Sequence, residues 1–247
     1  MRIGFIGFGK MGKAIAKGLK KKVLVYDPNF TVDGIKAKPV DSIKKLLSGS
    51  DVVILAVKPQ VMDGILEEIR KNETKGKTFI SIAAGISIPK IEQCVKGGVI
   101  RAMPNIACAV GEGAIALSKG ESAEEGDLKI AIEIMENTGK VFVIEEKYMD
   151  LVTAYTGAAP AYFALLVKFF YENASLFGLD PVLSKQLMLQ TAKGTAKLLE
   201  EYEPEQIIKM VATPGGITEQ GLKVLEDSRE TIKKVLEKGM AKTRELG

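Results

Sequence analysis

A glycine-rich turn near the start of the chain has the spacing of a dinucleotide-binding loop. Residues 7–12 fit G-x-G-x-x-G, after an apolar run that predicts a strand and before residues at helical spacing. In such a loop the first glycine allows a tight turn, the second admits a pyrophosphate, and the third lets the helix pack on the strand. The helix N-terminus would bind the phosphate through its free N–H groups and its dipole. We therefore predict that a dinucleotide contacts Gly7, Phe8, Gly9, Lys10, Met11 and Gly12, although a plain strand-to-helix turn is the alternative reading.

Asp27 ends the second predicted strand, residues 23–26, and lies about 20 residues beyond the first glycine. A carboxylate there would accept a hydrogen bond from the ribose 2′-hydroxyl and would repel a 2′-phosphate. The next residues, 28–30, include no arginine that could hold such a phosphate. We therefore expect NAD(P)H as the cofactor, with NADH modestly favoured by Asp27.

A second segment that could do chemistry, residues 211–218, lies between two predicted helices. Its Pro214-Gly215-Gly216 run breaks the helix, exposes backbone N–H groups and lets the main chain approach a ligand. The hydroxyls of Thr213 and Thr218, together with these amides, would suit a carboxylate and an imine or carbonyl. The alternative is an ordinary helix–helix turn in which Thr218 caps a helix over residues 219–226.

Histidine is absent from the 247 residues, which excludes Ser-His and Cys-His mechanisms and the most common metal ligand. Cys94 and Cys108 form no C-x-x-C or metal-ligand pattern. We expect no metal, so the chemistry must rest on a cofactor with hydroxyls, backbone amides, carboxylates or lysines. The net charge of +4 comes from scattered lysines, which indicates solvated helix faces rather than a nucleic-acid surface.

We expect no signal peptide, because the first residues already predict a strand of the fold. We expect no membrane-spanning segment, because Lys168 interrupts the longest apolar run. A cytoplasmic protein without a membrane partner is the resulting expectation.

Strands and helices alternate through the first 146 residues, which predicts an α/β fold with a Rossmann-type, doubly wound, mostly parallel sheet. Ligands of such sheets lie beyond the carboxyl ends of the strands. This rule gathers the glycine loop, Asp27 and the end of the strand at residues 51–57 around one crevice, together with residues 83–85 and 103–105. The predicted cofactor site therefore also contains Ala56, Val57, Lys58, Pro59 and Ala84.

From residue 147 to residue 247 the pattern predicts an all-helical dimerisation domain. Residues 161–176 are apolar nearly all round the helix, so this helix must be buried, and an obligate homodimer would bury it most fully. Asp180-Pro181 and Pro204 predict helix starts, and residues 227–230 fit a capping box for the last helix.

With these motifs, the whole chain resembles the pyrroline-5-carboxylate reductase family, the enzymes of the last step of proline biosynthesis. Residues 56–60, 101–105 and 110–113 resemble its cofactor-side and central motifs, and residues 211–226 resemble its signature. The resemblance implies NAD(P)H-dependent hydride transfer to the C=N bond of 1-pyrroline-5-carboxylate, giving L-proline. It also implies that the signature loop of one subunit completes the cofactor domain of another, in a homodimer or a larger ring of dimers. By this analogy the substrate is bound by Thr213, Gly215, Gly216, Ile217 and Thr218, with Thr218 in the catalytic role near the ring nitrogen.

The chain departs from the family in two places. Residues 156–161 lack a hydroxyl of the usual Ser-Gly-Ser-Gly-Pro-Ala-like run, and Lys168 replaces an acid. Two other functions are alternatives for such a chain. A 3-hydroxyacid dehydrogenase would place a catalytic lysine and asparagines closer to Gly157 than Lys168 and Asn173 are, and a nicotinamide sensor without turnover would not need the 214–218 loop.

Overall fold

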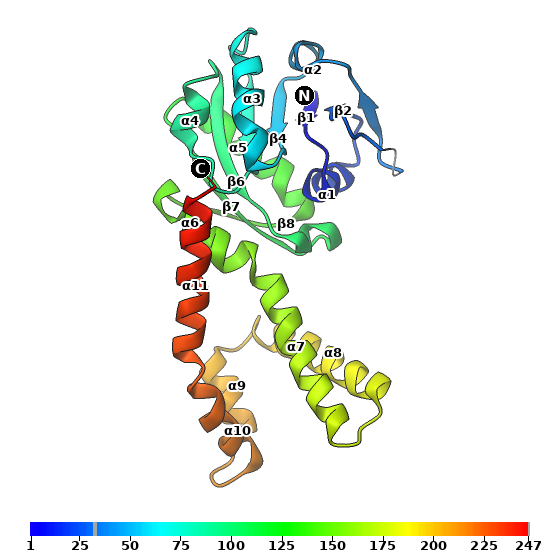
Figure 1. Cartoon of the computed structure of the whole chain (residues 1–247), viewed down its shortest axis with the longest axis vertical. Coiled ribbons are helices and arrows are strands. Elements are labelled where there is room, and N and C mark those ends of the chain that lie inside the picture. Colours follow the sequence, from blue (N-terminus) through cyan, green and yellow to red (C-terminus); the bar gives the residue numbers. More distant parts are fainter. Residues whose placement is uncertain (32–33, 247) are drawn as a thin grey trace. The chain divides into compact units, whose positions relative to one another are not determined.

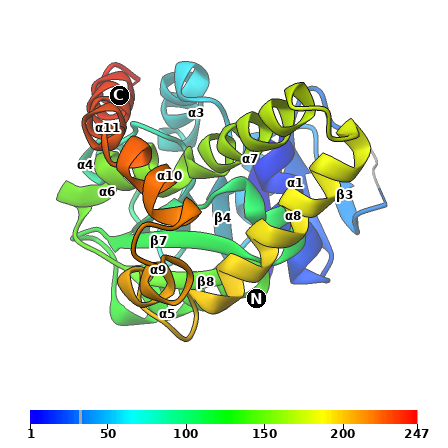
Figure 2. The same cartoon turned by 90° about the horizontal axis from the view of Figure 1, so that it is seen from below.

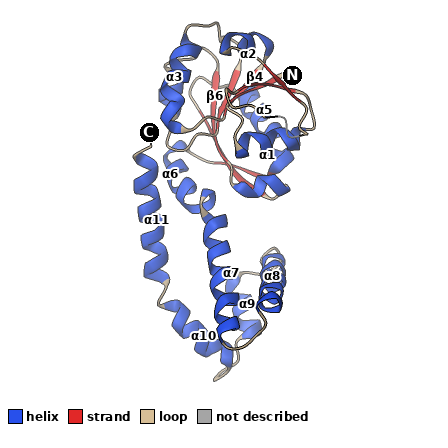
Figure 3. Cartoon of the chain, turned by 45° about the vertical axis from the view of Figure 1, so that its right-hand side comes forward, coloured by secondary structure: helices blue, strands red, loops and turns tan. Residues whose placement is uncertain are grey.

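The structure is a computed structural model that describes residues 1–31 and 34–246. The chain forms two compact units, one of residues 1–158 together with residues 238–246, the other of residues 159–237. The sequence predicted a boundary after residue 146, which follows the last strand, whereas the compact units divide twelve residues later, at Ala158. Every strand among the described residues lies in the first unit (Figure 3).

The first unit is built on one eight-stranded sheet with the order β3-β2-β1-β4-β5-β6-β7-β8 (Figure 1). The strands run parallel from β3 to β6, β7 is antiparallel to β6, and β8 is parallel to β7. The chain order reverses on either side of β1, which creates the switch point at which such sheets bind ligands. The strands are β1 Ile3–Ile6, β2 Val23–Tyr26, β3 Ala37–Pro39, β4 Val52–Leu55, β5 Thr78–Ser81, β6 Gly98–Met103, β7 Gly113–Lys119 and β8 Gly139–Val143.

Two apolar layers cover the two faces of this sheet, because successive strand side chains point to opposite faces. Phe5 and Ile54 belong to the layer that includes Ile15 and Ile134 from α1 and α5, whereas Phe79 belongs to the layer under α2, α3 and α4. The near-continuous apolar sequences of the central strands therefore reflect burial of both faces of the sheet. The helices are α1 Lys10–Leu19, α2 Ile43–Gly49, α3 Pro59–Arg70, α4 Ile88–Glu92 and α5 Glu125–Met135.

The strands predicted at residues 23–26 and 51–57 are confirmed as β2 and β4. The Ser42 hydroxyl caps α2 by accepting from the Lys45 N–H at 3.3 Å, and Pro59 is the first residue of α3. The sequence missed β3, a three-residue edge strand that ends in Pro39. Proline is tolerated there because an edge strand leaves part of its backbone unpaired. It also missed α4 and the antiparallel direction of β7.

The helical region predicted from residue 147 begins with a series of short turns rather than one regular helix. A 3₁₀ turn at Glu146–Tyr148 and α6, Met149–Val152, lead into a π-helical turn at Thr153–Gly157. π turns widen the helix and leave backbone groups to be satisfied by other partners, and they recur at functional sites.

The second unit contains α7 Ala159–Leu176, α8 Pro181–Leu198, α9 Pro204–Val211, α10 Ile217–Glu226 and the first half of α11, Arg229–Arg244. α7 and α8 pack side by side (Figure 2), and the Ser184 hydroxyl donates to the Tyr171 carbonyl at 2.8 Å. Asp180 caps α8 as predicted, accepting from the Leu183 N–H at 2.9 Å.

The apolar helix α7 is not covered within its own chain. No residue of α7 is buried, and the side chains of Phe163 and Leu176 are 67% and 82% exposed. The expectation that no segment could span a membrane by length was wrong, because residues 146–176 form one helical stretch long and apolar enough to do so despite Lys168.

Two predicted caps were also wrong. α10 begins at Ile217, so its N-cap is Gly216 and Thr218 lies inside the first turn. α11 begins at Arg229, so Asp227 follows α10 and does not cap α11. Proline and glycine end α9 at Val211, but the new helix starts as soon as Gly216 provides an extended residue before it.

Candidate active site

The glycine loop joins β1 to α1 and divides its three glycines by role. Gly7 has φ +84°, and a Cβ there would lie 2.7 Å from the Ala56 carbonyl oxygen. A Cβ on Gly12 would lie 3.4 Å from the Ala56 Cβ, so this glycine faces the neighbouring strand end. A Cβ on Gly9 would meet no described atom within 4 Å. Only Gly7 is thus required by its conformation and packing; Gly12 packs closely against the end of β4, whereas Gly9 borders open space into which a ligand could fit.

Asp27 joins the loop after β2 to the glycine loop. Its Oδ2 accepts from the Phe8 N–H at 2.6 Å, and its Oδ1 accepts from the Asn29 N–H at 2.8 Å. Each carboxylate oxygen can accept a further hydrogen bond, so both bonds are compatible with a ribose hydroxyl. The structure brings Asp27 together with Phe8 as the sequence predicted.

The first turn of α1 suits a bound anion. The turn starts at Lys10 and contains no acidic residue. Its N-cap is Gly9, which has no side chain to accept from the N–H groups of the turn. Its backbone N–H groups are therefore directed at the space beside Gly9. Sequence reasoning missed Lys13, whose Nζ donates to Thr31 Oγ1 at 2.9 Å and brings a cation to the loop after β2.

The neighbouring strand ends contribute the other predicted cofactor residues. The Ala56 N–H donates to the Ile6 carbonyl at 2.8 Å, which holds this segment beside the glycine loop. Lys58 is the exposed N-cap of α3 and Pro59 is its first residue. Ala84 packs on a small cluster that contains Met103, Ala116 and Met149.

Asn105 connects the end of β6 to the π turn, a link that sequence reasoning did not foresee. Asn105 is 8% exposed, its Nδ2 donates to the Thr156 carbonyl at 3.2 Å, and its Oδ1 accepts from the Ala114 N–H at 3.4 Å. A Cβ on Gly157 would lie 3.8 Å from the Met103 Sδ. The residues after β6 and the π turn therefore contact each other at the carboxyl end of β6.

Arg101 lies nearby with 3% of its surface exposed, and it pairs with Glu146 at 3.4 Å and Asp150 at 3.2 Å. Two carboxylates thus compensate one buried guanidinium, which ties β6 to the turns that follow β8.

The predicted substrate residues lie in the second unit, in the loop from α9 to α10 and in the first turn of α10; residues 213–218 together are called the 213–218 loop. Thr213, Gly215 and Ile217 are exposed, and Thr218 is half-buried. The Gly215 N–H donates to Glu219 Oε2 at 2.6 Å, and the Gly216 N–H donates to the Thr213 carbonyl at 2.9 Å. Both amides that the sequence offered as donors to a carboxylate are therefore engaged within the loop.

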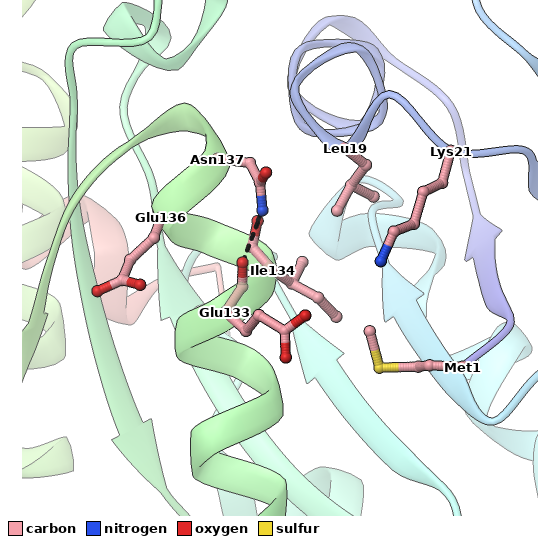
Figure 4. A pocket seen from close by; sticks show the side chains of 7 residues that line it. All are labelled: Met1, Leu19, Lys21, Glu133, Ile134, Glu136 and Asn137. Atoms are coloured by element: carbon pink, nitrogen blue, oxygen red, sulfur yellow. Dashed lines mark hydrogen bonds between the residues drawn. The ribbon is translucent and has the colours of Figure 1, made fainter.

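A cavity of about 300 Å³ lies away from all of these residues (Figure 4). Met1, which precedes β1, lines it together with side chains from the C-terminal ends of α1 and α5, whereas the glycine loop follows β1. It is thus at the opposite end of β1 from the predicted site. Among the described residues, no three acidic or cysteine side chains are grouped so that they could hold a metal ion.

Comparison with known proteins identifies relatives along the whole chain. A family profile described as "Pyrroline-5-carboxylate reductase dimerisation" matches residues 146–246, and one described as "NADP oxidoreductase coenzyme F420-dependent" matches residues 2–85. The chain is 34% identical to a pyrroline-5-carboxylate reductase of Methanosarcina acetivorans, covering 100% of this chain and 98% of the relative. It is 32% identical to pyrroline-5-carboxylate reductase 3 of Rattus norvegicus, covering 99% and 96%.

Solved structures agree over the same length. The Plasmodium falciparum pyrroline carboxylate reductase, solved with NADP bound, is 30% identical with a TM-score of 0.91, covering 100% of this chain and 98% of that one. A pyrroline-5-carboxylate reductase from Coxiella burnetii is 30% identical with a TM-score of 0.88, with the same coverage. A 3-hydroxyisobutyrate dehydrogenase of Mycobacterium tuberculosis, at 16% identity and a TM-score of 0.52, shares the fold alone.

Proposed function

The chain belongs to the pyrroline-5-carboxylate reductase family, and from that premise we propose how its own residues perform the NAD(P)H-dependent reduction of 1-pyrroline-5-carboxylate to L-proline. The observation that carries the proposal is the open glycine loop of the first unit, where a Cβ on Gly9 would meet no described atom within 4 Å. In the second unit, residues 213–218 lead into the first turn of α10, whose N–H groups precede the helical hydrogen bonds.

In the cofactor site, the pyrophosphate would lie beside Gly9, where a Cβ would meet open space, and on the N–H groups of the first turn of α1. Residues 56–59 and Ala84 would line the nicotinamide end of the crevice. The small side chains of Ala56 and Ala84 would leave room for a flat ring. When bound, the reduced nicotinamide supplies a hydride to the carbon of the substrate C=N bond.

NADH is proposed to be modestly favoured over NADPH, because the Asp27 carboxylate would accept from a ribose hydroxyl and repel a phosphate. Lys13 acts in the opposite direction, since its ammonium lies near the same loop. The P. falciparum relative was solved with NADP bound, which supports use of both cofactors. The expected preference is accordingly a ratio and not an exclusion.

In the substrate site, the pyrroline ring would be lined by Thr213, Gly215, Gly216, Ile217 and Thr218, and its carboxylate would lie on the N–H groups of the first turn of α10. Thr218 would hold the ring nitrogen by a hydrogen bond. An imine is most electrophilic when its nitrogen is protonated, so these residues need to orient the substrate and stabilise its charge rather than to act as a strong base. A chain without histidine is sufficient for this role.

The dimerisation domain makes the protein a homodimer. We propose that the 213–218 loop of one protomer completes the cofactor crevice of its partner, that dimers can assemble into a larger ring, and that the protein is cytoplasmic. The exposed apolar surface of α7 supports the first of these statements, because a second copy would cover it.

The decisive experiment is to measure NADH and NADPH oxidation by the purified protein with and without pyrroline-5-carboxylate. Oxidation that depends on this substrate, with proline as the product, is the expected result. Absence of oxidation with both cofactors would overturn the proposal. Stabilisation of the protein by cofactor without turnover would then favour a nicotinamide sensor.

A further inference from the structure

Glu219 is the acidic residue in the first turn of α10, and its carboxylate contacts both the 213–218 loop and the next turn of α10. Oε2 accepts from the Gly215 N–H at 2.6 Å, four residues back along the chain. Oε1 lies 3.3 Å from the Nζ of Lys223, one turn further along α10. The Glu219 side chain is half-buried, whereas Gly215 and Lys223, which it contacts, are exposed.

The contact with Gly215 fixes an otherwise adaptable backbone. Gly215 has φ +73°, in the left-handed region, and the Gly216 N–H donates to the Thr213 carbonyl at 2.9 Å. Glycine loses more conformational freedom on ordering than other residues do, so a loop with two consecutive glycines needs specific bonds to keep one shape. The Glu219 carboxylate provides one of them and the Thr213 carbonyl the other.

This arrangement determines which amides can receive a substrate carboxylate. The first N–H of α10 that donates within the helix belongs to Gln220, which donates to the Gly216 carbonyl at 3.4 Å. The N–H groups of residues 217–219 precede it, as at any helix start. With Gly215 and Gly216 engaged inside the loop, the donors directed outward belong to the first turn of α10 and not to the two glycines.

We propose that Glu219 is a positioning residue that holds the 213–218 loop in its substrate-binding shape, and that Lys223 neutralises it so that an anionic substrate is not repelled. The proposal rests on the proposed function. Glu219 acts through the Gly215 amide and does not touch the reacting atoms. A charge-assisted bond of this kind preorganises the loop before the substrate arrives, which lowers the cost of binding.

The test separates the hydrogen bond from the charge. Glu219→Ala removes both, Glu219→Gln keeps an acceptor oxygen but no charge, and Lys223→Met leaves the charge without its partner. Glu226→Ala, at the far end of α10, is the matched control for loss of an acid from the same helix. For each purified full-length variant, kcat and KM are measured for pyrroline-5-carboxylate and for the preferred cofactor, with dimer formation and thermal unfolding as checks on folding.

We expect Glu219→Ala to raise the KM for pyrroline-5-carboxylate about tenfold, with a smaller change in kcat and none in the KM for the cofactor. Glu219→Gln should restore a KM within about twofold of the wild type, since the acceptor remains. Lys223→Met should raise the KM a few-fold, and the double variant Lys223→Met with Glu219→Gln should reverse that increase.

Three results would overturn the proposal. An unchanged KM in Glu219→Ala would make Glu219 an ordinary helix-start residue. A lowered KM would mean that its carboxylate competes with the substrate for the Gly215 amide. A Glu219→Gln variant as impaired as Glu219→Ala would reject the hydrogen bond as the cause. Should Glu219→Ala fail to fold, the Lys223→Met and double variants test the same statement, and an inactive wild type would count against the proposed function instead.

Discussion

The two compact units of this chain bury their apolar side chains to very different extents. In the first, Phe5, Ile54 and Phe79 are completely buried between the sheet and its helices. In the second, α7 has no buried residue, and Phe163 and Leu176 are mostly exposed. The first unit therefore completes its core within one chain, whereas α7 of the second is left uncovered, and we propose that the homodimer covers it.

The division of the chain into two units also separates cofactor binding from substrate binding in the proposed reaction. The glycine loop and Asp27 belong to the unit that is complete by itself, whereas the substrate loop belongs to the unit that needs a second copy. Cofactor binding should thus tolerate loss of the dimer, and turnover should not.

The largest effect is expected from a charge placed on the exposed apolar surface of α7, which tests whether a second copy covers this helix. Phe169 is 50% exposed in the single chain, and Phe169→Glu would bury an unpaired carboxylate in the dimer. Such a charge costs on the order of 4 kcal/mol, or about 10³-fold in the dimer equilibrium. We expect monomers by light scattering, loss of turnover and retained binding of NAD(P)H.

Lys129→Glu, an exposed substitution on α5, is the control for added negative charge and should remain dimeric and active. A dimeric, active Phe169→Glu protein would contradict the view that α7 is covered by a partner.

The next largest effect is expected at Thr218 in the second unit. Thr218→Ala should lower kcat on the order of 10²-fold if its hydrogen bond strengthens in the transition state. Because Gly216 and not Thr218 is the N-cap of α10, the thermal stability should change little. Steady-state kinetics and calorimetry measure the two effects, and Thr218→Ser should retain most activity. Unchanged turnover in Thr218→Ala would remove this residue from the catalytic role.

In the first unit, Gly9 and Gly7 should respond in opposite ways to the same substitution. Gly9→Ala puts a methyl group into open space and should raise the KM for cofactor about tenfold without loss of stability. Gly7→Ala forces a φ of +84° and a contact with the Ala56 carbonyl, and should destabilise the fold by about 1–3 kcal/mol. Denaturant unfolding and cofactor titration separate the two, and equal effects would refute the division of roles.

A smaller change is expected from Asp27→Ser, which should shift the ratio of kcat/KM values toward NADPH by a few-fold to about tenfold. The loop should loosen as well, because the Phe8 N–H loses its acceptor at 2.6 Å. Asp63→Ser, on α3, controls for loss of a surface acid. An unchanged NADH/NADPH ratio would exclude Asp27 from the ribose site.

The smallest effect concerns the pH dependence of the first unit. The Arg2 guanidinium hydrogen-bonds to the Asp51 carboxyl at 2.7 Å and lowers its pKa from 3.8 to about 2. A lowered pKa means that this pair stabilises the fold above pH 3.8 and loses that contribution as the pH falls toward 2.

Asp51→Asn should therefore cost at most about 1 kcal/mol at pH 7, because both side chains are substantially exposed. Thermal unfolding from pH 7 to pH 2 should show the difference between variant and wild type shrinking below pH 4. A difference that is constant with pH would exclude the ion pair as its cause.

The sequence predicted those features that depend on neighbouring residues. Residues 7–12 and Asp27 each follow a strongly apolar strand. Because parallel strands bring their carboxyl ends to one edge of a sheet, the sequence alone predicted that these residues lie close together. Proline marks the starts of α3, α8 and α9 for a similarly local reason, since its fixed φ suits the first turn of a helix.

The sequence did not predict the contacts between elements that are distant along the chain. Neither the Asn105 contact with the Thr156 carbonyl nor the Lys13 contact with Thr31 has a sequence pattern, because each depends on how separate elements are arranged. The N-cap of α10 was misassigned because Gly216 and Thr218 both suit that position, and only the observed backbone distinguishes them.

The pattern of residue types along the chain was thus sufficient to predict the Rossmann-type unit, the glycine loop and the family to which this protein belongs. The tertiary structure decided how the substrate loop is held, since Glu219 and Gly215 meet only when Gly215 takes a left-handed conformation. It also showed that α7 remains exposed within one chain. The physical reason is that hydrophobic periodicity records that a surface must be buried, whereas the partner that buries it is set by the three-dimensional arrangement of the elements.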